Sequence, residues 1–136
     1  MDYSVSSVKE IGGIGGSLIN FIARDDLAVK TFGQINCITI TQGCVKGNHY
    51  HKAKEEWLIS LQGKVRVVLK ELSTEKTEEV ILDSKLPRER LRIGRNIGHA
   101  VQCLSDETAI LVEYCSEPFN PGQEDRFSCY VIEKDL

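Results

Sequence analysis

The sequence predicts an all-β fold, a small antiparallel β-sandwich or β-barrel, and three observations support this prediction. Short runs rich in β-branched and aromatic residues, several with period-two alternation, recur along the 136 residues. Clusters of Gly, Pro, Asn, Asp and Ser separate these runs every several residues, as is typical of all-β domains. No segment shows the apolar period of an amphipathic helix. Chain length corresponds to one domain, expected to span residues 1–136.

The N-terminal part of the chain combines strand-like runs with a glycine-rich link. Residues 3–10 alternate weakly and are expected to form an edge strand, which IGGIGG at 11–16 follows. This link is similar to a phosphate-binding loop, but no buried strand precedes it and no amphipathic helix follows, so a flexible turn is the better interpretation. SLINFIAR at 17–24 is expected to be a strand. FGQINCITIT at 32–41 is a stronger one, because β-branched residues dominate it.

Alternation is clearer in the rest of the chain. In KVRVVLKEL, Val65, Val67 and Leu69 share one face of the expected strand. Pro121 and Gly122 make FNPGQED an irregular loop. The other expected strands carry the histidines near 49–51 and cover 56–62, 64–72, 78–83, part of 84–94, 98–104, 108–115 and 127–133.

Composition excludes several classes of partner. The chain carries 17 basic and 20 acidic residues, a net charge of −3, so no overall basic field favours nucleic acid or an anionic membrane. No apolar run is long enough to span a membrane, and the N-terminus lacks a signal-peptide pattern. The five cysteines are odd in number and form no C-x-x-C pair, which favours reduced thiols in a cytoplasmic protein.

The three histidines of the chain define the candidate site. His49 and His51 are two residues apart, so on a β-strand they point to the same face. Glu56 enters on the next expected strand, and His99 comes from a distant one. Three imidazoles and a carboxylate suit one divalent metal, either Fe, Mn, Ni or Zn. They suit proton transfer equally, because histidine titrates near neutral pH.

Each of these residues has a simpler interpretation as well. His49 and His51 are also compatible with a half-exposed strand, and His99 with a core histidine. Glu55 competes with Glu56 for the acidic position. We favour a functional role for the three histidines because no other histidine occurs in the chain.

Basic residues lie close to the histidines in the sequence. Lys46 precedes the histidine pair, and Arg95 lies four residues before His99. As surface charges they need no explanation. As a group with three further arginines they are suited to hold a diphosphate, which Arg binds in a bidentate manner. The three are Arg88, Arg90 and Arg92.

The histidine region resembles the first motif of the cupin superfamily, G-x5-H-x-H-x4-E-x6-G. The motif runs from Gly43 to Gly63, with His49, His51 and Glu56 at its ligand positions. This resemblance implies a small antiparallel β-barrel, or jelly roll, with its site inside. It also implies that His49, His51 and Glu56 bind a metal together with the histidine of a second motif.

The second cupin motif, G-x5-P-x-G-x2-H-x3-N, is matched less well. His99 occupies its histidine position. Gly94 and Asn96 replace the expected Pro and Gly, and Cys103 replaces the final Asn. The prediction that His99 completes the metal site therefore depends on its match to one position of the second motif and on the good match of the first motif.

The residues around the histidines narrow the resemblance to RmlC-like cupins. KGNHYHKAKEEWL at 46–58 is similar to segments of dTDP-4-dehydrorhamnose 3,5-epimerases and dTDP-sugar 3,4-ketoisomerases. It is also similar to the C-terminal cupin domain of capsular polysaccharide biosynthesis enzymes. EPFNPGQEDRF at 117–127 resembles the segment after the barrel in these enzymes.

This resemblance implies an isomerase or epimerase of a nucleotide-diphosphate-linked 4-keto-6-deoxy sugar, in polysaccharide or deoxysugar biosynthesis. In such enzymes a base removes the proton next to the carbonyl, and the enolate is reprotonated on another face or atom. By position, His49 matches the base, and Lys46 the basic residue near the nucleotide phosphates. His51 matches the second histidine of the ketoisomerases, and Tyr114 is the candidate general acid.

Two other functions stay open. The ligand set also suits a metal-dependent cupin of other chemistry, such as a dioxygenase or a small-molecule isomerase. A non-catalytic sugar-binding module is the third hypothesis, because fold alone does not decide function. We also expect a homodimer, because the edge strands of so small a sheet need covering and the N-terminal segment is suited to pair with a partner subunit.

Overall fold

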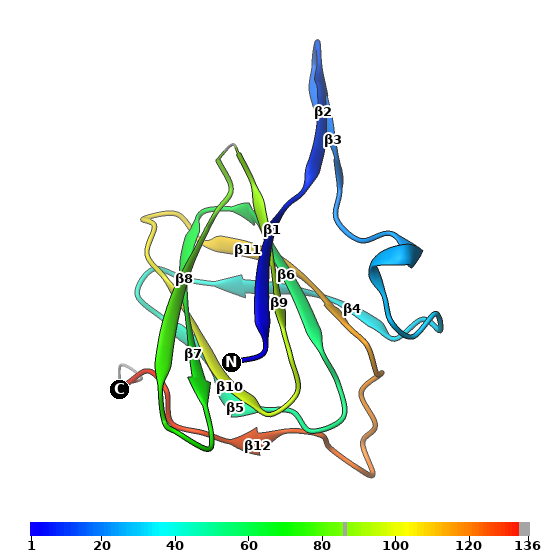
Figure 1. The fold of residues 1–136 in the computed structure, drawn as a ribbon. Coiled ribbons are helices and arrows are strands. Elements are labelled where there is room, and N and C mark those ends of the chain that lie inside the picture. Colours follow the sequence, from blue (N-terminus) through cyan, green and yellow to red (C-terminus); the bar gives the residue numbers. More distant parts are fainter. Residues whose placement is uncertain (86, 134–136) are drawn as a thin grey trace.

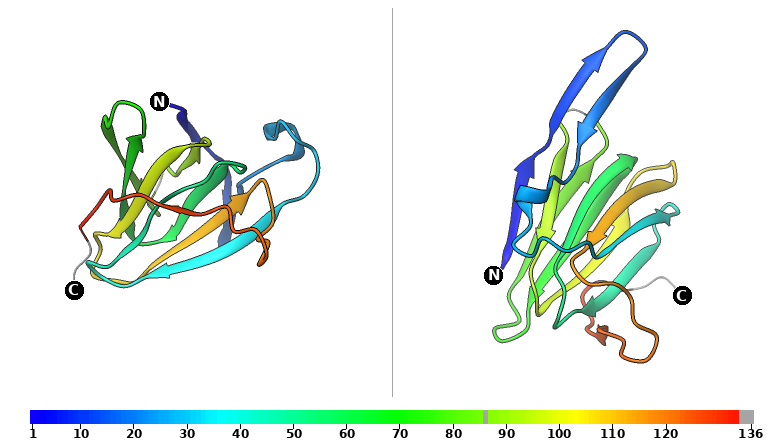
Figure 2. Two further views of the ribbon diagram at one scale, coloured as in Figure 1. Left: turned by 90° about the horizontal axis from the view of Figure 1, so that it is seen from below. Right: turned by 90° about the vertical axis from the view of Figure 1, so that its right-hand side faces the viewer.

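The computed structural model describes residues 1–85 and 87–133, and within them two five-stranded antiparallel sheets enclose a common interior (Figures 1 and 2). The first sheet has the order β1 (Tyr3–Ser7), β9 (Glu89–Ile93), β6 (Glu56–Gln62), β11 (Ala109–Cys115), β4 (Gln34–Ile40). The second has the order β12 (Phe127–Ser128), β5 (Val45–Tyr50), β10 (Ile97–Cys103), β7 (Lys64–Glu71), β8 (Thr77–Asp83). The predicted all-β fold is therefore confirmed.

The core lies between the two sheets and follows the predicted alternation. Val65, Val67 and Leu69 on β7 are fully buried, as their shared face requires. Leu58 on β6 and Leu111 on β11 face them from the other sheet in the same hydrophobic cluster. Burying a side chain of this size stabilises the fold by about 1.5–3 kcal/mol. The core fills most of the interior and leaves one part of it to polar residues.

Two further short elements stand outside these sheets. β2 (Lys9–Gly13) and β3 (Gly16–Asn20) form a separate hairpin that projects from the body of the molecule (Figures 1 and 2). Residues 11–13 of IGGIGG belong to β2 and Gly16 to β3, so the turn predicted for 11–16 is confirmed only at the tip, where Gly15 has a φ of 87°. The predicted strand at 17–24 ends earlier, and a 3-10 turn, η1 (Arg24–Asp26), follows it.

The C-terminal part of the chain differs from the prediction. Only Phe127–Ser128 forms a strand, although 127–133 was expected to be one. After this strand, the backbone N–H of Cys129 donates to the backbone oxygen of Asn48 at 2.9 Å. The amide oxygen of Asn48 then accepts hydrogen bonds from the backbone N–H groups of Val131 and Ile132, each at 2.9 Å. No helix in the part of the chain that the structure describes is long and apolar enough to cross a membrane.

Gly47 allows β5 to approach β10 closely beside the histidines. Its φ is +102°, and a Cβ there would lie 2.9 Å from the backbone oxygen of His99. The pairing of β5 with β10 shifts register between His99 and Ala100, at the same place. Only glycine adopts this conformation without strain.

We therefore expect Gly47→Ala to lower the free energy of unfolding by about 1–3 kcal/mol, because it combines a positive φ with a backbone clash. Chemical denaturation measures this change. Gly12→Ala is the matched control, since no atom lies within 4 Å of a Cβ at Gly12. Equal stability of Gly47→Ala and wild type would contradict the close approach of β5 and β10.

Candidate functional site

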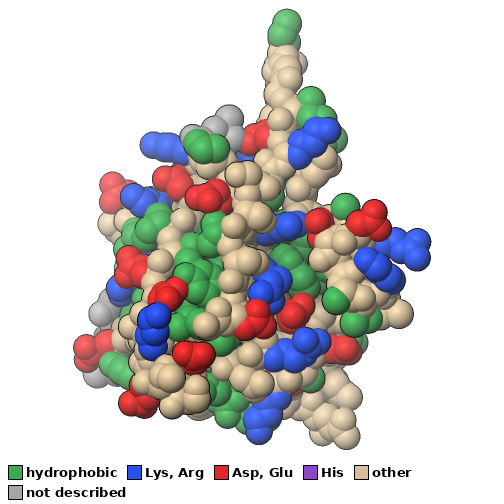
Figure 3. Space-filling model, in the orientation of Figure 1, with side chains coloured by type: hydrophobic (Ala, Val, Ile, Leu, Met, Phe, Trp, Pro, Cys, Tyr) green, Lys and Arg blue, Asp and Glu red, His purple; other side chains and the backbone are tan. Residues whose placement is uncertain are grey.

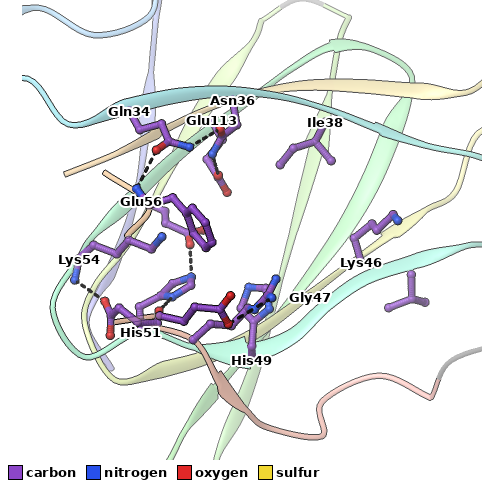
Figure 4. Close-up of a pocket in the computed structure, with 15 residues that line it drawn as sticks. Gln34, Asn36, Ile38, Lys46, Gly47, His49, His51, Lys54, Glu56 and Glu113 are labelled. Atoms are coloured by element: carbon purple, nitrogen blue, oxygen red, sulfur yellow. Dashed lines mark hydrogen bonds and ion pairs between the residues drawn. The ribbon is translucent and has the colours of Figure 1, made fainter. Parts of the chain in front are cut away.

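The three histidines and Glu56 come together at one end of the interior, as the sequence predicted. His49 lies on β5, His51 directly after β5, Glu56 at the start of β6 and His99 on β10. The imidazole centroids are 4.8 Å apart for His49 and His99, 4.9 Å for His49 and His51, and 5.5 Å for His51 and His99. One candidate ligand atom from each of the four residues lies within 4.8 Å of the others. Figure 4 shows His49, His51 and Glu56 converging, and β5 and β6, from which they come, belong to the two opposite sheets.

Three of these four side chains are almost completely buried. The exposed fractions are 6% for His51, 3% for Glu56 and 3% for His99. Burial alone raises the pKa of the Glu56 carboxyl, but His99 and His51 outweigh it and hold that pKa well below its usual range. Burial also opposes a charge on His99, yet the Glu56 carboxylate raises the pKa of that imidazole. The cluster therefore stabilises a negative charge on Glu56 inside the protein.

His49 differs from the other two histidines because it is only half-buried and lines the open pocket. Burial, and then the nearby His99 and His51, lowers the pKa of His49 to about 4, although the Glu56 carboxylate opposes this. The imidazole of His49 is therefore neutral at pH 7. A neutral imidazole has a free lone pair, which can accept a proton or bind a metal.

Hydrogen bonds fix how the two buried imidazoles are turned. Nδ1 of His99 donates to the backbone oxygen of Ile97 at 3.0 Å, and Nδ1 of His51 donates to the backbone oxygen of Asp125. The opposite ring nitrogens, Nε2, therefore face the Glu56 carboxylate. Nε2 of His99 lies 3.4 Å from Oε2 of Glu56, and Nε2 of His51 contacts Oε1 of Glu56. A bare lone pair repels a carboxylate, so each contact requires a proton or a cation at Nε2.

A divalent metal fits this donor set. Among the described residues, Nε2 of His51 and Nε2 of His99 are buried without a hydrogen-bond partner of good geometry. Such orphaned ring nitrogens, each with its Nδ1–H held by a backbone oxygen, are typical of metal-binding histidines. With His49 and the Glu56 carboxylate they offer three nitrogens and an oxygen, which suit Zn, Fe, Mn or Ni.

A pocket of about 500 Å³ opens in front of the cluster. Gln34 and Asn36 of β4 line it on one side, and Lys46 of β5 on another (Figure 4). Lys54 and Arg126 add two further positive groups. Four acidic residues line it as well: Glu56, Glu113, Glu124 and Asp125. The pocket therefore combines amide groups, a neutral imidazole and charges of both signs, which suits a polar small molecule.

Tyr114 is not brought to this pocket, so its prediction as general acid is wrong. Its side chain lies on the opposite face of β11, where the ring packs against Trp57 at 5.7 Å. Its hydroxyl accepts a hydrogen bond from the backbone N–H of Gly33 at 3.0 Å. Side chains alternate along a strand, so the preceding residue, Glu113, faces the pocket instead.

Glu113 is thus the titratable side chain that β11 contributes to the site (Figure 4). Its carboxylate accepts a hydrogen bond from the Asn36 side chain at 2.9 Å. Burial, and then the nearby Glu56 carboxylate, raises the pKa of Glu113 to about 7. A carboxyl with this pKa is suited to exchange a proton near neutral pH.

Of the basic residues predicted to bind a diphosphate, only Lys46 lies at the pocket. Arg95 does not line it: its Nε donates to the backbone oxygen of Ala53 at 3.0 Å, and its Nη1 lies 3.6 Å from Glu55. The other arginines form ion pairs with acidic residues at the surface or beside the N-terminal strands: Arg88 with Glu10, Arg90 with Asp26, and Arg92 with Asp2 and Glu55.

Several other pocket residues were not predicted from the sequence. Gln34 and Asn36 lie two residues apart on a strand that was predicted correctly, so they share one face of it. This shared face was the sequence signal that could have identified them as pocket residues. Lys54, Asp125 and Arg126 lie outside the strands. Their approach to the histidines depends on contacts between segments far apart in the sequence.

Residues 16–127 match the polysaccharide biosynthesis C-terminal domain. The chain belongs to this family. No curated protein shows significant sequence similarity to it.

Several solved structures resemble this polysaccharide biosynthesis C-terminal domain. A dTDP sugar isomerase from Desulfovibrio desulfuricans G20 has a TM-score of 0.83 at 18% identity, over 98% of this chain and 85% of that one. QdtA, a sugar 3,4-ketoisomerase from Thermoanaerobacterium thermosaccharolyticum solved in complex with TDP, has a TM-score of 0.79 at 22% identity, over 95% and 89%. The capsular polysaccharide assembling protein CapF from Staphylococcus aureus has a TM-score of 0.71 at 23% identity, over 91% of this chain and 34% of CapF.

These similarities show the fold of the domain. It is the RmlC-like cupin fold, so the cupin resemblance is confirmed despite the poor second motif. The two paired antiparallel sheets and the interior site are those that the resemblance implied.

Proposed function

We propose that this domain is an isomerase or epimerase of a nucleotide-diphosphate-linked 4-keto-6-deoxy sugar, with His49 as the base. The observation that carries the proposal is the neutral, half-buried His49 imidazole facing a polar pocket of about 500 Å³. Structures of the same fold support it: one is a dTDP sugar isomerase, and a mutant of QdtA was solved with TDP-4-keto-6-deoxyglucose. The family's link to polysaccharide biosynthesis agrees with such a substrate.

The reaction uses groups that the pocket already holds. The keto group acidifies the neighbouring C–H, and His49 accepts that proton while the electrons form an enolate. Glu113 faces the same pocket and is available to exchange a proton with the enolate, on another face for epimerisation or at another atom for ketoisomerisation. Lys46 and Arg126 supply positive charge for the diphosphate.

A metal-dependent cupin of other chemistry, such as a dioxygenase or a small-molecule isomerase, is the second candidate. The observation that favours it is the convergence of His49, His51, Glu56 and His99 with two orphaned ring nitrogens. These four residues would hold one divalent metal. When bound, such a metal polarises a carbonyl oxygen as a Lewis acid.

Incubation with a panel of dTDP- and UDP-linked 4-keto-6-deoxy sugars, followed by NMR, tests the proposal. A new sugar isomer from at least one substrate is the expected result. Absence of any product, from folded protein with and without added metal, would contradict it. Thermal stabilisation by a sugar nucleotide without turnover would then favour a non-catalytic sugar-binding module.

We also propose that the domain is a homodimer, because its projecting hairpin exposes apolar side chains to water. Ile11, Ile14 and Leu18 of this hairpin are exposed by 52%, 110% and 55%, and Figure 3 shows a hydrophobic side chain at its tip. A two-stranded hairpin without further packing is marginally stable at best. A second copy of the chain would bury these side chains.

Light scattering should therefore give twice the chain mass of 15.2 kDa. The double change Ile11→Asp and Leu18→Asp should shift the protein toward the monomer. Ile81 lies on β8 of the second five-stranded sheet and is exposed by 39%, so Ile81→Asp is the control and should not shift the protein toward the monomer. A monomeric wild-type protein at micromolar concentration would contradict the dimer.

A further inference from the structure

The segment after β11, residues 116–133, crosses the open side of the interior and is called the C-terminal strap (Figures 1 and 2). Its short strand β12 pairs with β5, where Ser128 lies opposite His49. Phe119, Glu124 and Arg126 of the strap line the pocket. The strap therefore forms one wall of the site, although it contributes none of the four candidate metal ligands.

Asp125 attaches this strap to the loop that follows the histidine pair. Its carboxylate accepts hydrogen bonds from three successive backbone N–H groups, those of Lys52, Ala53 and Lys54, at 2.8, 2.9 and 3.2 Å. Hydrogen bonds to an ionised carboxylate are among the strong ones in proteins. The loop from His51 to β6 is therefore fixed by a residue more than 70 positions away.

The backbone of the same residue holds the imidazole of His51. The Asp125 carbonyl oxygen accepts the hydrogen bond from Nδ1 of His51, so the ring hydrogen resides on Nδ1 and Nε2 faces Glu56. His99 obtains the same arrangement locally, from the carbonyl of Ile97 two residues earlier on its own strand. Of the two buried histidines, His51 alone depends on the strap for its orientation.

We propose that Asp125 is a positioning residue, which holds the Nδ1–H and the orientation of His51 and thereby sets the affinity of the site for a divalent cation. Its carboxylate fixes the loop, and its carbonyl fixes the ring. The cation-affinity part rests on the metal interpretation given under the proposed function, whereas the ring-orientation part does not. Outer partners of this kind contribute about 10–100-fold to metal affinity.

Two measurements on Asp125→Ala test this proposal. In metal-free protein, NMR of the imidazoles should show the Nδ1–H of His51 as a slowly exchanging, hydrogen-bonded proton in wild type and as a rapidly exchanging one in Asp125→Ala. Titration with Zn²⁺ alone, by calorimetry, should show an affinity about 10–100-fold lower for Asp125→Ala than for wild type. Asp125→Asn keeps one acceptor oxygen and should recover part of both effects.

Asp106→Ala is the matched control, because the Asp106 carboxylate also accepts a long-range hydrogen bond, from the Gln42 side chain at 2.8 Å, but outside the site. It should change neither readout. Unchanged exchange of the His51 Nδ1–H in folded Asp125→Ala would overturn the proposal whatever the metal result. If wild type binds no Zn²⁺, the affinity part is overturned, and the NMR measurement alone decides whether Asp125 positions His51.

Discussion

His49→Asn should lower turnover of the keto-sugar substrate by about 10²–10⁴-fold, the usual contribution of a general base. The physical reason is that His49 is the half-buried imidazole of the cluster, neutral at pH 7 and open to the pocket. Asn is polar and of similar size, but it has no lone pair basic enough to accept the proton. Initial rates measured by NMR on the best substrate of the panel give the size of the effect.

Two controls separate a chemical role of His49 from a structural one. Circular dichroism and thermal unfolding should show that His49→Asn folds as the wild type does. Tyr50→Phe changes the next residue of β5, whose ring stacks on Phe127 at 5.3 Å, and should retain activity. Undiminished turnover by His49→Asn would rule out His49 as the base.

Glu56→Gln should abolish stoichiometric metal binding, with an affinity loss of at least about 100-fold, since even outer partners of metal ligands contribute about 10–100-fold. Glu56 is the carboxylate that both orphaned ring nitrogens face. In wild type, Zn²⁺ at 100 times its dissociation constant should raise the free energy of unfolding by about 2.7 kcal/mol, and in Glu56→Gln it should not. Metal analysis of protein purified without a His tag, together with thermal unfolding, measures both effects.

Glu55→Gln is the matched control for this experiment. Glu55 was the rival acidic residue in the sequence, but its carboxylate pairs with Arg92 and Arg95 at 3.4 and 3.6 Å. Its replacement should leave metal affinity unchanged. If wild type contains no metal and gains no stability from Fe, Mn, Ni or Zn, the metal-dependent candidate is removed.

The fold and the histidine cluster were predictable because local patterns specify them. Strands such as β7 have one face in the core, so their apolar residues alternate. The spacing of His49, His51 and Glu56 places them at the end of one strand and the start of the next along the chain, one strand in each sheet. His99 was predicted correctly although the motif around it is incomplete.

Tyr114 was assigned wrongly because β11 is covered on both faces. Leu111 lies in the core between the sheets, while Tyr114 packs on the outer face against Trp57 and Phe32. A strand with two apolar faces shows no clear alternation, so its register cannot be read from the pattern. The pairing of β11 with β6 also shifts between Ile110 and Leu111.

The C-terminal strap was unpredictable for a different reason. Its position depends on hydrogen bonds from single side chains to distant backbone, chiefly those of Asn48 and Asp125. Such contacts leave no periodic signal in the sequence. Arg95 was misplaced in the same way, because its partner Glu55 and the carbonyl of Ala53 belong to another loop.

Solvent deuterium uptake into the 4-keto-6-deoxy sugar nucleotides, followed by NMR, tests the central claim most directly. The proposed chemistry predicts deuterium at C3 or C5 of the sugar with wild type and its loss with His49→Asn. This result would establish proton abstraction next to the carbonyl and identify the carbon involved. Absence of exchange in every substrate, from folded wild-type protein with and without added metal, would contradict it.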